Sequence, residues 1–300
     1  MTEAERAAVI KESSLLKEYL LKCMPEPGKF STAIEGLSML RRESGSHVEN
    51  CFYKPSIGLI VQGNKHSRVG SEEYTYGENQ CLLVSVDMPS SFSSSEASHD
   101  RPFLAVSLDL DRFLIARLAM ELPAVSDPGS NTCKGVVVAD ADFDLVNAFL
   151  RLVRLLENRD QVAFLAPAVV QEIHYRLLTG PLGKNLQKFS TCGTHSNQIA
   201  RAVAWLRENY KEPLRVEDLA RRVNMGTSTF HRHFKQVTTL SPLQYHKRLR
   251  LYEAQRLMLM EDADAASAGL SVGYESPTQF SREYKRMFGE PPRRDVMRRR

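Results

Sequence analysis

One hexapeptide pattern occurs twice in this sequence, and no other feature restricts the possible folds as strongly. FHRHFK occupies residues 230–235, and FSREYK occupies residues 280–285. The segments before them also correspond, with VNMGTST at 223–229 and VGYESPTQ at 272–279. Because self-similarity of this kind marks a repeated supersecondary unit, the C-terminal third is expected to contain two copies of one small fold.

The first copy has the pattern of a helix-turn-helix. A short helix is expected over 216–223, a turn at NMG (224–226), and a second helix over 228–237 with Ser228 as its N-cap. The second helix has an apolar face and a polar, basic face, formed by Phe230, Phe234 and Val237 on one side and by Ser228, His231, Arg232 and Lys235 on the other. Such a helix can enter the major groove of DNA, and we call it a reading helix.

The second copy repeats this design. A support helix is expected over 263–272, a turn at GYES (273–276), and a reading helix over 277–288, where Pro277 suits the first helical turn. Phe280, Tyr284 and Met287 are expected to point inward, and Thr278, Ser281, Arg282 and Lys285 outward. The aromatic residues of each copy are therefore expected to form a small core, and the basic residues remain available for contact with DNA.

A long helix is expected between the copies, over residues 241–260, with Ser241 as its cap and Pro242 in its first turn. About 18 residues at ~1.5 Å each give a rod of roughly 27 Å. Two reading helices joined by this rod can lie about one duplex turn apart, near the ~34 Å half-site repeat of DNA. One chain would thus build what a simple helix-turn-helix protein builds as a dimer.

The charge of the chain is divided unevenly. Residues 195–300 hold 20 Lys and Arg against 12 Asp and Glu, whereas residues 1–194 hold 20 against 24. A basic segment attached to an acidic one indicates that only the C-terminal part meets a polyanion such as DNA.

The N-terminal part has the pattern of a small β-barrel. After a helix at 4–22, strand-like runs occur at 56–63, 73–77, 80–88 and 103–110, separated by Gly, Asn, Ser and Pro. The serine-rich segment 90–98 is expected to be a connecting loop. Two apolar helices follow at 143–158 and 163–180, and they pack either on their own barrel or in a homodimer interface.

The fold class expected is α+β with two domains. A cupin-like barrel with flanking helices would occupy residues 1–182, a linker 183–195, and an all-α domain with two helix-turn-helix units 196–300. No segment approaches the ~20 apolar residues of a membrane span, and the N-terminus has no signal-peptide pattern, so a cytoplasmic location is expected.

Catalysis and metal binding have little support in the sequence. The strand region holds only His66 and His99, whereas a facial triad needs two clustered histidines and a carboxylate. We find no nucleotide-binding or hydrolase motif, and expect no catalytic residue, cofactor or metal. The five cysteines show no C-x-x-C pair, so they are buried thiols or, at Cys51 and Cys81 beside the strands, a redox or electrophile sensor.

At the level of families, LARRVNM, FHRHFK, SPLQYHKRLRLYEAQRLM and VGYESPTQFSREYKRMFGEPP resemble the DNA-binding domain of AraC/XylS-type bacterial transcription regulators over about 196–295. Residues 55–89 resemble the cupin-like regulatory domain of one subgroup. The resemblance implies a regulator that responds to a small molecule, binds promoter DNA and contacts RNA polymerase. The alternatives are an effector-independent DNA-binding protein and a cupin enzyme fused to a DNA-binding domain.

The resemblance also implies particular base-contacting positions, namely Ser228, His231 and Arg232 in the first reading helix, and Pro277, Thr278, Ser281 and Arg282 in the second. Arg232 is expected to contact a guanine, Arg282 a guanine or a phosphate, and Lys235 and Lys285 phosphates or solvent. Pro277 has no side-chain donor, so direct readout there is in doubt. The C-terminal residues 297–300 are expected to be a disordered basic tail.

Two departures from the family pattern concern stability. Thr239 follows Thr238 where the family usually has glycine, so the end of the first reading helix is expected to be altered. Gly269 stands where alanine is usual, and its lower helix propensity, about 1 kcal/mol, suggests a softer second unit.

Overall fold

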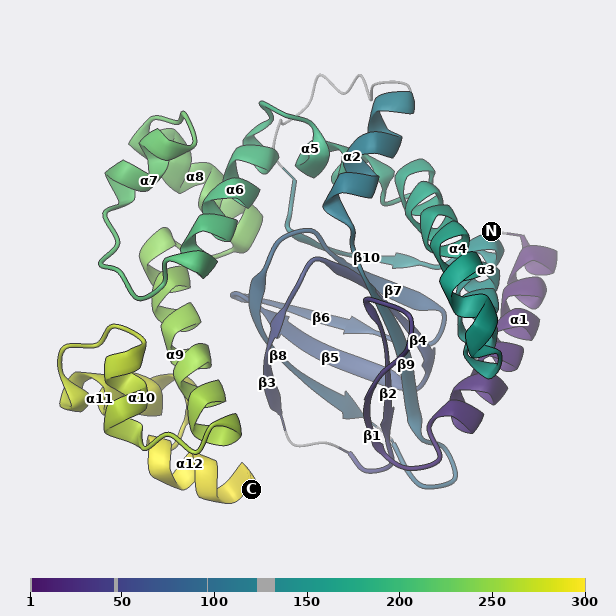
Figure 1. The fold of residues 1–300 in the computed structure, drawn as a ribbon, viewed down its shortest axis with the longest axis horizontal. Coiled ribbons are helices and arrows are strands. Elements are labelled where there is room, and N and C mark those ends of the chain that lie inside the picture. The colour runs from purple at the N-terminus through teal and green to yellow at the C-terminus, as the bar shows by residue number, and fades with distance from the viewer. Residues whose placement is uncertain (1, 46–47, 96, 123–132, 300) are drawn as a thin grey trace. The chain divides into compact units, whose positions relative to one another are not determined.

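The computed structural model describes residues 2–45, 48–95, 97–122 and 133–299 and divides the chain into two compact units, Met1–Asn197 and Gln198–Arg300 (Figure 1). The first unit contains the strands and the second is helical. Among the helices in these ranges, none has both the length and the apolar character that crossing a bilayer requires.

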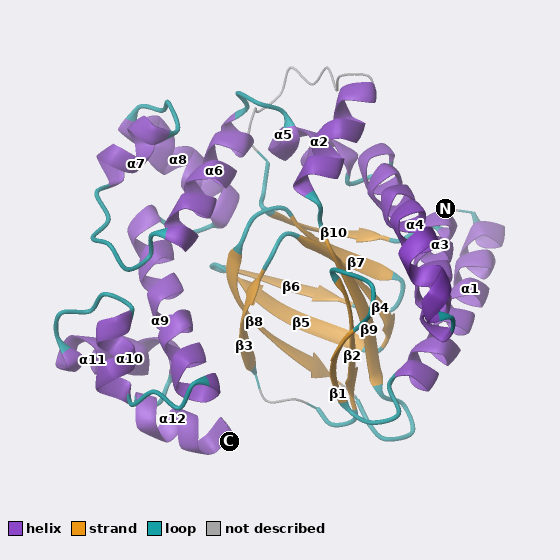
Figure 2. Ribbon diagram, viewed as in Figure 1, coloured by secondary structure: helices purple, strands orange, loops and turns teal. Residues whose placement is uncertain are grey.

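The strands of the first unit form two antiparallel sheets that face each other (Figure 2). The six-stranded sheet has the order β1 (Gly28–Ser31), β2 (Leu37–Arg42), β9 (Phe103–Asp109), β4 (Ser56–Gln62), β7 (Gln80–Val84) and β10 (Val136–Asp140). The four-stranded sheet has the order β3 (Glu49–Tyr53), β8 (Met88–Ser95), β5 (Asn64–Val69) and β6 (Glu72–Tyr76). This confirms the expected β domain with flanking helices.

Helices cover the outer face of the six-stranded sheet. They are α1 (Glu3–Cys23), α2 (Arg112–Glu121), α3 (Phe143–Arg154), a short 3₁₀ turn (Leu155–Glu157), α4 (Arg159–Thr179) and α5 (Gly183–Ser190). The strands alternate, so that Ile57 and Leu59 of β4 join the core under the helices, whereas Gly58 and Ile60 face the space between the sheets. The period-2 pattern thus separates a helix-covered core from an inner cavity.

Residues 90–95 of the serine-rich segment lie in a strand, so the prediction of a loop over 90–98 was wrong there; residue 96 lies outside the described residues. Residues 88–95 form β8, which pairs with β3 on one side and β5 on the other. Serine is a weak strand former, but both edges of this backbone find partners, and Ser90 and Ser94 are small enough to be buried. Pairing across the sheet therefore overrides local propensity here.

Residues 183–195, expected to be a linker, begin with helix α5, in which Leu186 and Phe189 are buried. These apolar side chains give the segment a place in the packing of the first unit, and this makes it more ordered than a linker. The domain boundary itself stays a prediction.

The second unit consists of helices with short connections. They are α6 (His195–Glu208), α7 (Val216–Arg222), α8 (Thr227–Thr238), α9 (Pro242–Met260), α10 (Ala265–Ser271), α11 (Pro277–Phe288) and α12 (Pro292–Arg299). Figure 1 shows α7 and α8 near one end of α9, and α10 and α11 near the other. The expected pair of helix-turn-helix units on one long helix is confirmed.

Residues 297–299 lie in helix α12, so the prediction of a disordered tail was wrong for them; residue 300, also part of that prediction, lies outside the described residues. Asp295 is fully buried, and its carboxylate accepts hydrogen bonds from Tyr284 Oη at 2.7 Å, Gln255 Nε2 at 2.6 Å and Arg299 Nε at 2.8 Å. The bonds from Tyr284 and Gln255 hold the last helix against α11 and α9, and the bond from Arg299 lies within α12. Hydrogen bonds to a buried carboxylate are strong, so they hold helix α12 in place. The arginine-rich sequence did not indicate this buried carboxylate.

Candidate nucleic-acid interface and barrel cavity

The first reading helix, α8, presents the expected two faces. Phe230, Phe234 and Val237 are buried, and the ring of Phe234 lies edge-on to Tyr245 of α9 with centroids 5.6 Å apart. Ser228, His231, Arg232 and Lys235 are exposed. Ser228 is not the N-cap, because the helix begins one residue earlier and Gly226 occupies the cap position without a side-chain bond. Ser228 therefore has its hydroxyl on the outer surface of the first turn.

The second reading helix, α11, begins where the sequence placed it. Ser276 is the N-cap and its hydroxyl accepts from the Gln279 N–H at 3.3 Å, with Pro277 in the first turn. Phe280 and Tyr284 are buried, whereas Met287 is half-buried. Pro277, Thr278, Arg282 and Lys285 are exposed and Ser281 is half-buried. The candidate DNA contacts of both copies thus lie on outward faces.

The two turns are built alike. Asn224 and Gly273 occupy equivalent positions with positive φ, 56° and 90°. The next N–H in each copy bonds back to the support helix, from Met225 to Ala220 O at 2.9 Å and from Tyr274 to Gly269 O at 3.0 Å. Left-handed backbone suits glycine and, less well, asparagine, which explains the residue types at these two positions.

Gly269 allows two helices to pack closely. It is therefore no reason to expect lower stability of the second helix-turn-helix copy. A Cβ built at Gly269 would lie 2.9 Å from Cγ of Phe280. Alanine would need Phe280 to move, and Phe280 is fully buried in the core of this copy. The glycine lets the support and reading helices approach closely.

Helix α9 is capped at its start and, farther along, is bonded to two loops. Its N-terminus has a full capping box, in which Ser241 Oγ accepts from Gln244 N–H and Gln244 Oε1 accepts from Ser241 N–H. Farther along, Arg250 donates to four carbonyl oxygens, those of Tyr210, Lys211, Glu212 and Gly273, at 2.6 to 3.0 Å. One guanidinium therefore joins the loop after α6 to the turn of the second copy.

Glu283 fixes the second reading helix in the same way. This buried carboxylate accepts from Lys247 Nζ of α9 at 2.8 Å and from the Tyr274 hydroxyl at 2.9 Å. The resulting bonds hold α11 against α9 and its own turn. A rod that packs on the first copy through Tyr245 and Phe234 and is bonded to the second copy suits a fixed spacing of the two reading helices.

The basic side chains on the reading faces have no acidic partners. Within residues 198–299, Arg221 pairs with Asp218 and Arg256 with Glu253 and Glu261, whereas no carboxylate pairs with Arg232, Lys235, Arg282 or Lys285. Arg232 lies 3.4 Å from Nε2 of His233, its only described polar contact. Unpaired cations on exposed helix faces are suited to phosphates and to guanine edges.

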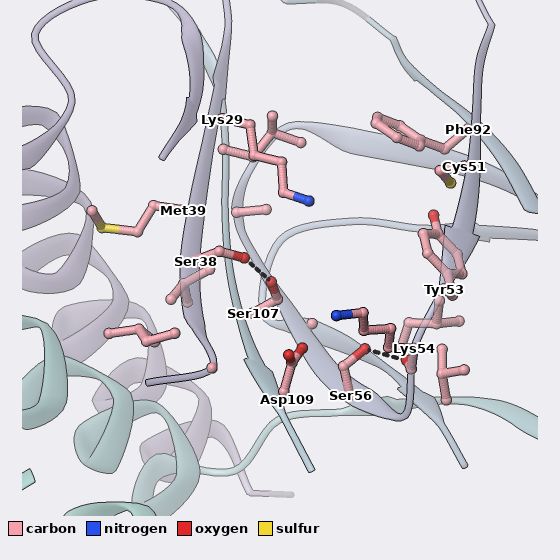
Figure 3. A pocket seen from close by; sticks show the side chains of 18 of the residues that line it. Lys29, Ser38, Met39, Cys51, Tyr53, Lys54, Ser56, Phe92, Ser107 and Asp109 are labelled. Carbon is pink, nitrogen blue, oxygen red and sulfur yellow. Dashed lines mark hydrogen bonds between the residues drawn. The ribbon is translucent and has the colours of Figure 1, made fainter. Parts of the chain in front are cut away.

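The space between the two sheets is a cavity of about 510 Å³, within the range of small-molecule pockets. Figure 3 shows Lys29, Lys54, Tyr53 and Ser107 projecting into it, whereas Met39 points away. Ser38 and Ser107 share a hydrogen bond of 2.9 Å on its wall. Ile60, Leu82, Val84 and Ala105 contribute apolar surface. Sequence patterns did not locate this cavity, because β1, β2, β3 and β5 were not predicted as strands.

The predicted thiol-sensor cysteines lie in settings that disfavour the reactive thiolate. Cys51 lines the cavity, and Cys81 is buried under the helices, where its thiol donates to Ala139 O at 3.3 Å. Burial raises the pKa of each thiol to about 12. Since the thiolate is the nucleophile, both side chains are suited to packing rather than to sensing.

The histidines of the barrel do not come together. His66 Nδ1 contacts Thr75 Oγ1 at 2.9 Å, and His99 Nδ1 contacts Glu43 at 2.9 Å. In the parts of the chain that the structure describes, no group of three or more His, Cys, Asp or Glu side chains could hold a metal ion.

Comparison with known proteins assigns the family. The sequence model for the AraC-type transcriptional regulator N-terminus matches residues 33–185, and a helix-turn-helix domain model matches residues 219–298. The chain belongs to the AraC-type transcriptional regulators. The family match covers strands β2 to β10 and helices α2 to α4, so the resemblance that residues 55–89 indicated is confirmed.

The chain is 32% identical to the HTH-type transcriptional regulator ArgR of Pseudomonas aeruginosa over 154 residues, 51% of this chain and 47% of ArgR. It is 30% identical to the activator RhaS of Escherichia fergusonii over 143 residues, 48% of this chain and 51% of RhaS. The matched region thus spans about half of each relative.

A similar fold occurs in ToxT from Vibrio cholerae. One ToxT structure has a TM-score of 0.57 at 11% identity and covers 87% of this chain and 97% of ToxT. A second, with unsaturated fatty acid bound, has a TM-score of 0.56 at 11% identity and covers 91% of this chain and 97% of that one. These similarities concern the fold.

Proposed function

We propose that this protein is a sequence-specific, DNA-binding transcription regulator whose two reading helices enter successive major grooves of promoter DNA. The observation that carries the proposal is the pair of equivalent helix-turn-helix copies fixed to α9, each with unpaired basic side chains outward. Base readout is assigned to Ser228, His231, Arg232, Thr278, Ser281 and Arg282, and backbone contact to Lys235 and Lys285.

We further propose that a small molecule bound in the barrel cavity modulates DNA binding. An effector-independent protein would not need a 510 Å³ space lined by both polar and apolar side chains. The fatty acid bound to ToxT, a protein of similar fold, supports the same view. The family assignment and the separate positions of His66 and His99 favour a regulator that binds an effector over a cupin enzyme.

A second copy of this chain is the partner that the surface of the first unit suits best. Phe113 and Met120 of α2 are 89% and 80% exposed, and Phe164 of α4 is 82% exposed. The two helices are neighbours, with Arg117 Nη2 donating to Gln171 Oε1 at 3.2 Å. Large apolar side chains on adjoining helices favour burial against a second copy.

Two further assignments rest on the family alone. A regulator of this type acts on RNA polymerase at a promoter, so we propose that polymerase is a partner. Promoter DNA lies in the bacterial cytoplasm, and we place the protein there.

DNase footprinting of the full-length protein on DNA flanking its own gene tests the central proposal. We expect two protected major grooves about 10 base pairs apart, on one face of the duplex. Equal affinity for this DNA and for a scrambled fragment would contradict sequence-specific binding.

A further inference from the structure

Lys65 is a cation inside the barrel that the fold does not explain. It belongs to β5 and lies opposite Tyr76 of β6 and Ser94 of β8. Its Nζ lies over two aromatic rings, 4.2 Å from the Phe92 centroid and 5.3 Å from the Tyr53 centroid. All four of Lys65, Tyr53, Tyr76 and Phe92 line the cavity. Lys65 is half-buried, and its ammonium lies in the cavity over two ring faces.

No carboxylate neutralises this ammonium among the residues that the structure describes. The nearby acid Glu49 is engaged by Arg42, whose guanidinium donates to it at 2.9 to 3.1 Å. Lys29 of β1 adds a second cation to the cavity lining. Burial is the largest influence on Lys65 and lowers its pKa to about 8, so the side chain is still mostly charged at pH 7.

The groups beside Lys65 are neutral hydroxyls. Ser67 Oγ lies 3.1 Å from Tyr53 Oη and 3.2 Å from Tyr76 Oη, which forms a chain of hydroxyl groups along the four-stranded sheet. Burial raises the pKa of both phenols, so they remain hydrogen-bonding groups without charge. The facing six-stranded sheet supplies the apolar side chains of Ile60, Leu82, Val84 and Ala105, together with the polar residues Lys29, Ser38, Ser107 and Asp109. The cavity therefore has a hydroxyl-rich wall around Lys65 and a facing wall on which apolar side chains lie beside polar ones.

We propose that the effector is a small carboxylic acid, with its carboxylate on Lys65 Nζ and its apolar body against the six-stranded sheet. This rests on the proposed function of the cavity as the effector site. A cationic ligand is disfavoured because Lys65 already occupies the ring faces that would receive it. A neutral ligand would leave the ammonium without a counter-ion. A carboxylate supplies that charge and forms a charge-assisted hydrogen bond in a partly desolvated site.

Calorimetric titration of the full-length protein at pH 7 tests this with two probe series matched in size. The first is 3-phenylpropanoate, 3-phenylpropan-1-ol and 3-phenylpropan-1-amine, and the second is octanoate, octan-1-ol and octan-1-amine. We expect at least one acid to bind at least about ten-fold more tightly than its alcohol and amine, because a hydrogen bond to a charged group is lost in both. Equal binding of acid and alcohol, or no binding of either acid at millimolar concentration, would overturn the proposal.

Substitution of Lys65 tests whether its side chain binds the carboxylate. Lys65→Met retains the length and packing of the side chain, and we expect it to weaken acid binding about ten-fold or more without lowering the melting temperature. Lys65→Arg keeps the charge and should retain part of the affinity. Lys184→Met removes an exposed lysine of α5 and is the matched control. If Lys65→Met is folded and binds the acid as tightly as the parent, the inference fails.

The footprint on operator DNA separates the two proposals. A protein that binds its operator but no acid refutes only the ligand class. A protein that binds acids but no specific DNA refutes the proposed function instead.

Discussion

Thr239 and Gly289 occupy equivalent positions at the ends of the two reading helices, and both have positive φ, 62° and 85°. Each N–H bonds back at 2.8 Å, from Thr239 to Lys235 O and from Gly289 to Lys285 O. Both helices therefore end on a residue with positive φ and the same backbone hydrogen bond, although only one of the two residues is glycine. A β-branched residue in this conformation is strained. The altered helix end expected from the sequence therefore consists of backbone strain at Thr239, and the closing hydrogen bond of the helix is kept.

Replacing Thr239 by glycine should stabilise the protein. Removal of the strained side chain is expected to raise the free energy of unfolding by about 1 kcal/mol. The reverse change, Gly289→Thr, should lower it by a similar amount, since nothing lies within 4 Å of a Cβ there and only the backbone opposes it. Urea denaturation measures both. If Thr239→Gly lowers the denaturation midpoint, contacts of the threonine outweigh its strain.

Gly269→Ala should destabilise the second copy although alanine is the better helix former. The gain of up to about 1 kcal/mol in propensity is expected to be smaller than the loss from displacing Phe280. Ala220→Gly, at the equivalent position of the first copy, should also destabilise, by about 1 kcal/mol. A higher melting temperature for Gly269→Ala would show that the Phe280 ring can move without loss.

Arg232→Ala should weaken binding to the operator by about 1–3 kcal/mol and relax the preference at one base step. Lys235→Ala should weaken binding to every sequence alike and lower the salt dependence by about one counter-ion. Gel-shift titrations on operator variants at several salt concentrations distinguish these effects. Arg256→Ala, which removes a paired arginine of α9, provides the control. An equal loss on specific and random DNA would make Arg232 a phosphate contact.

The second unit should lose stability in acid through His246. Its Nε2 donates to Tyr210 O at 2.9 Å, and burial, followed by the charge of Arg250, lowers its pKa from 6.5 to about 4. The neutral form is favoured by folding, so this contribution is complete above pH 6.5 and is lost as the pH falls toward 4. Thermal melts of the parent and of His246→Gln at pH 7 and pH 5 test it. The difference between the two pH values should be smaller in the variant, and an equal difference would assign the acid sensitivity elsewhere.

If the first unit forms a homodimer through α2 and α4, Phe164→Asp should convert it to a monomer. A charge in an apolar interface is expected to cost several kcal/mol, enough to separate the copies at micromolar concentration. Light scattering after gel filtration measures the mass. Ile10→Asp, on exposed α1, should leave it unchanged. If the parent protein is itself a monomer, the exposed apolar residues of α2 and α4 do not form a dimer interface.

The helices of the C-terminal unit could be predicted closely because the signals lie within each segment. Residues 277–288 were expected as a helix and form α11 with the same limits, since Ser276, Pro277 and the spacing of Phe280 and Tyr284 all act locally. The N-cap of α8 was misplaced by two residues, because Gly226 caps without a side-chain bond that a residue type would reveal.

By itself the sequence determined the repeated helix-turn-helix, the two faces of each reading helix and the capped helix between them, because i to i+4 spacing and caps are properties of contiguous residues. Only the tertiary structure decided that a serine run is a central strand, that Lys65 turns inward between two rings, and that Gly269 admits Phe280. Each of these depends on a partner far along the chain, in a sheet register or a helix contact that local pattern does not encode.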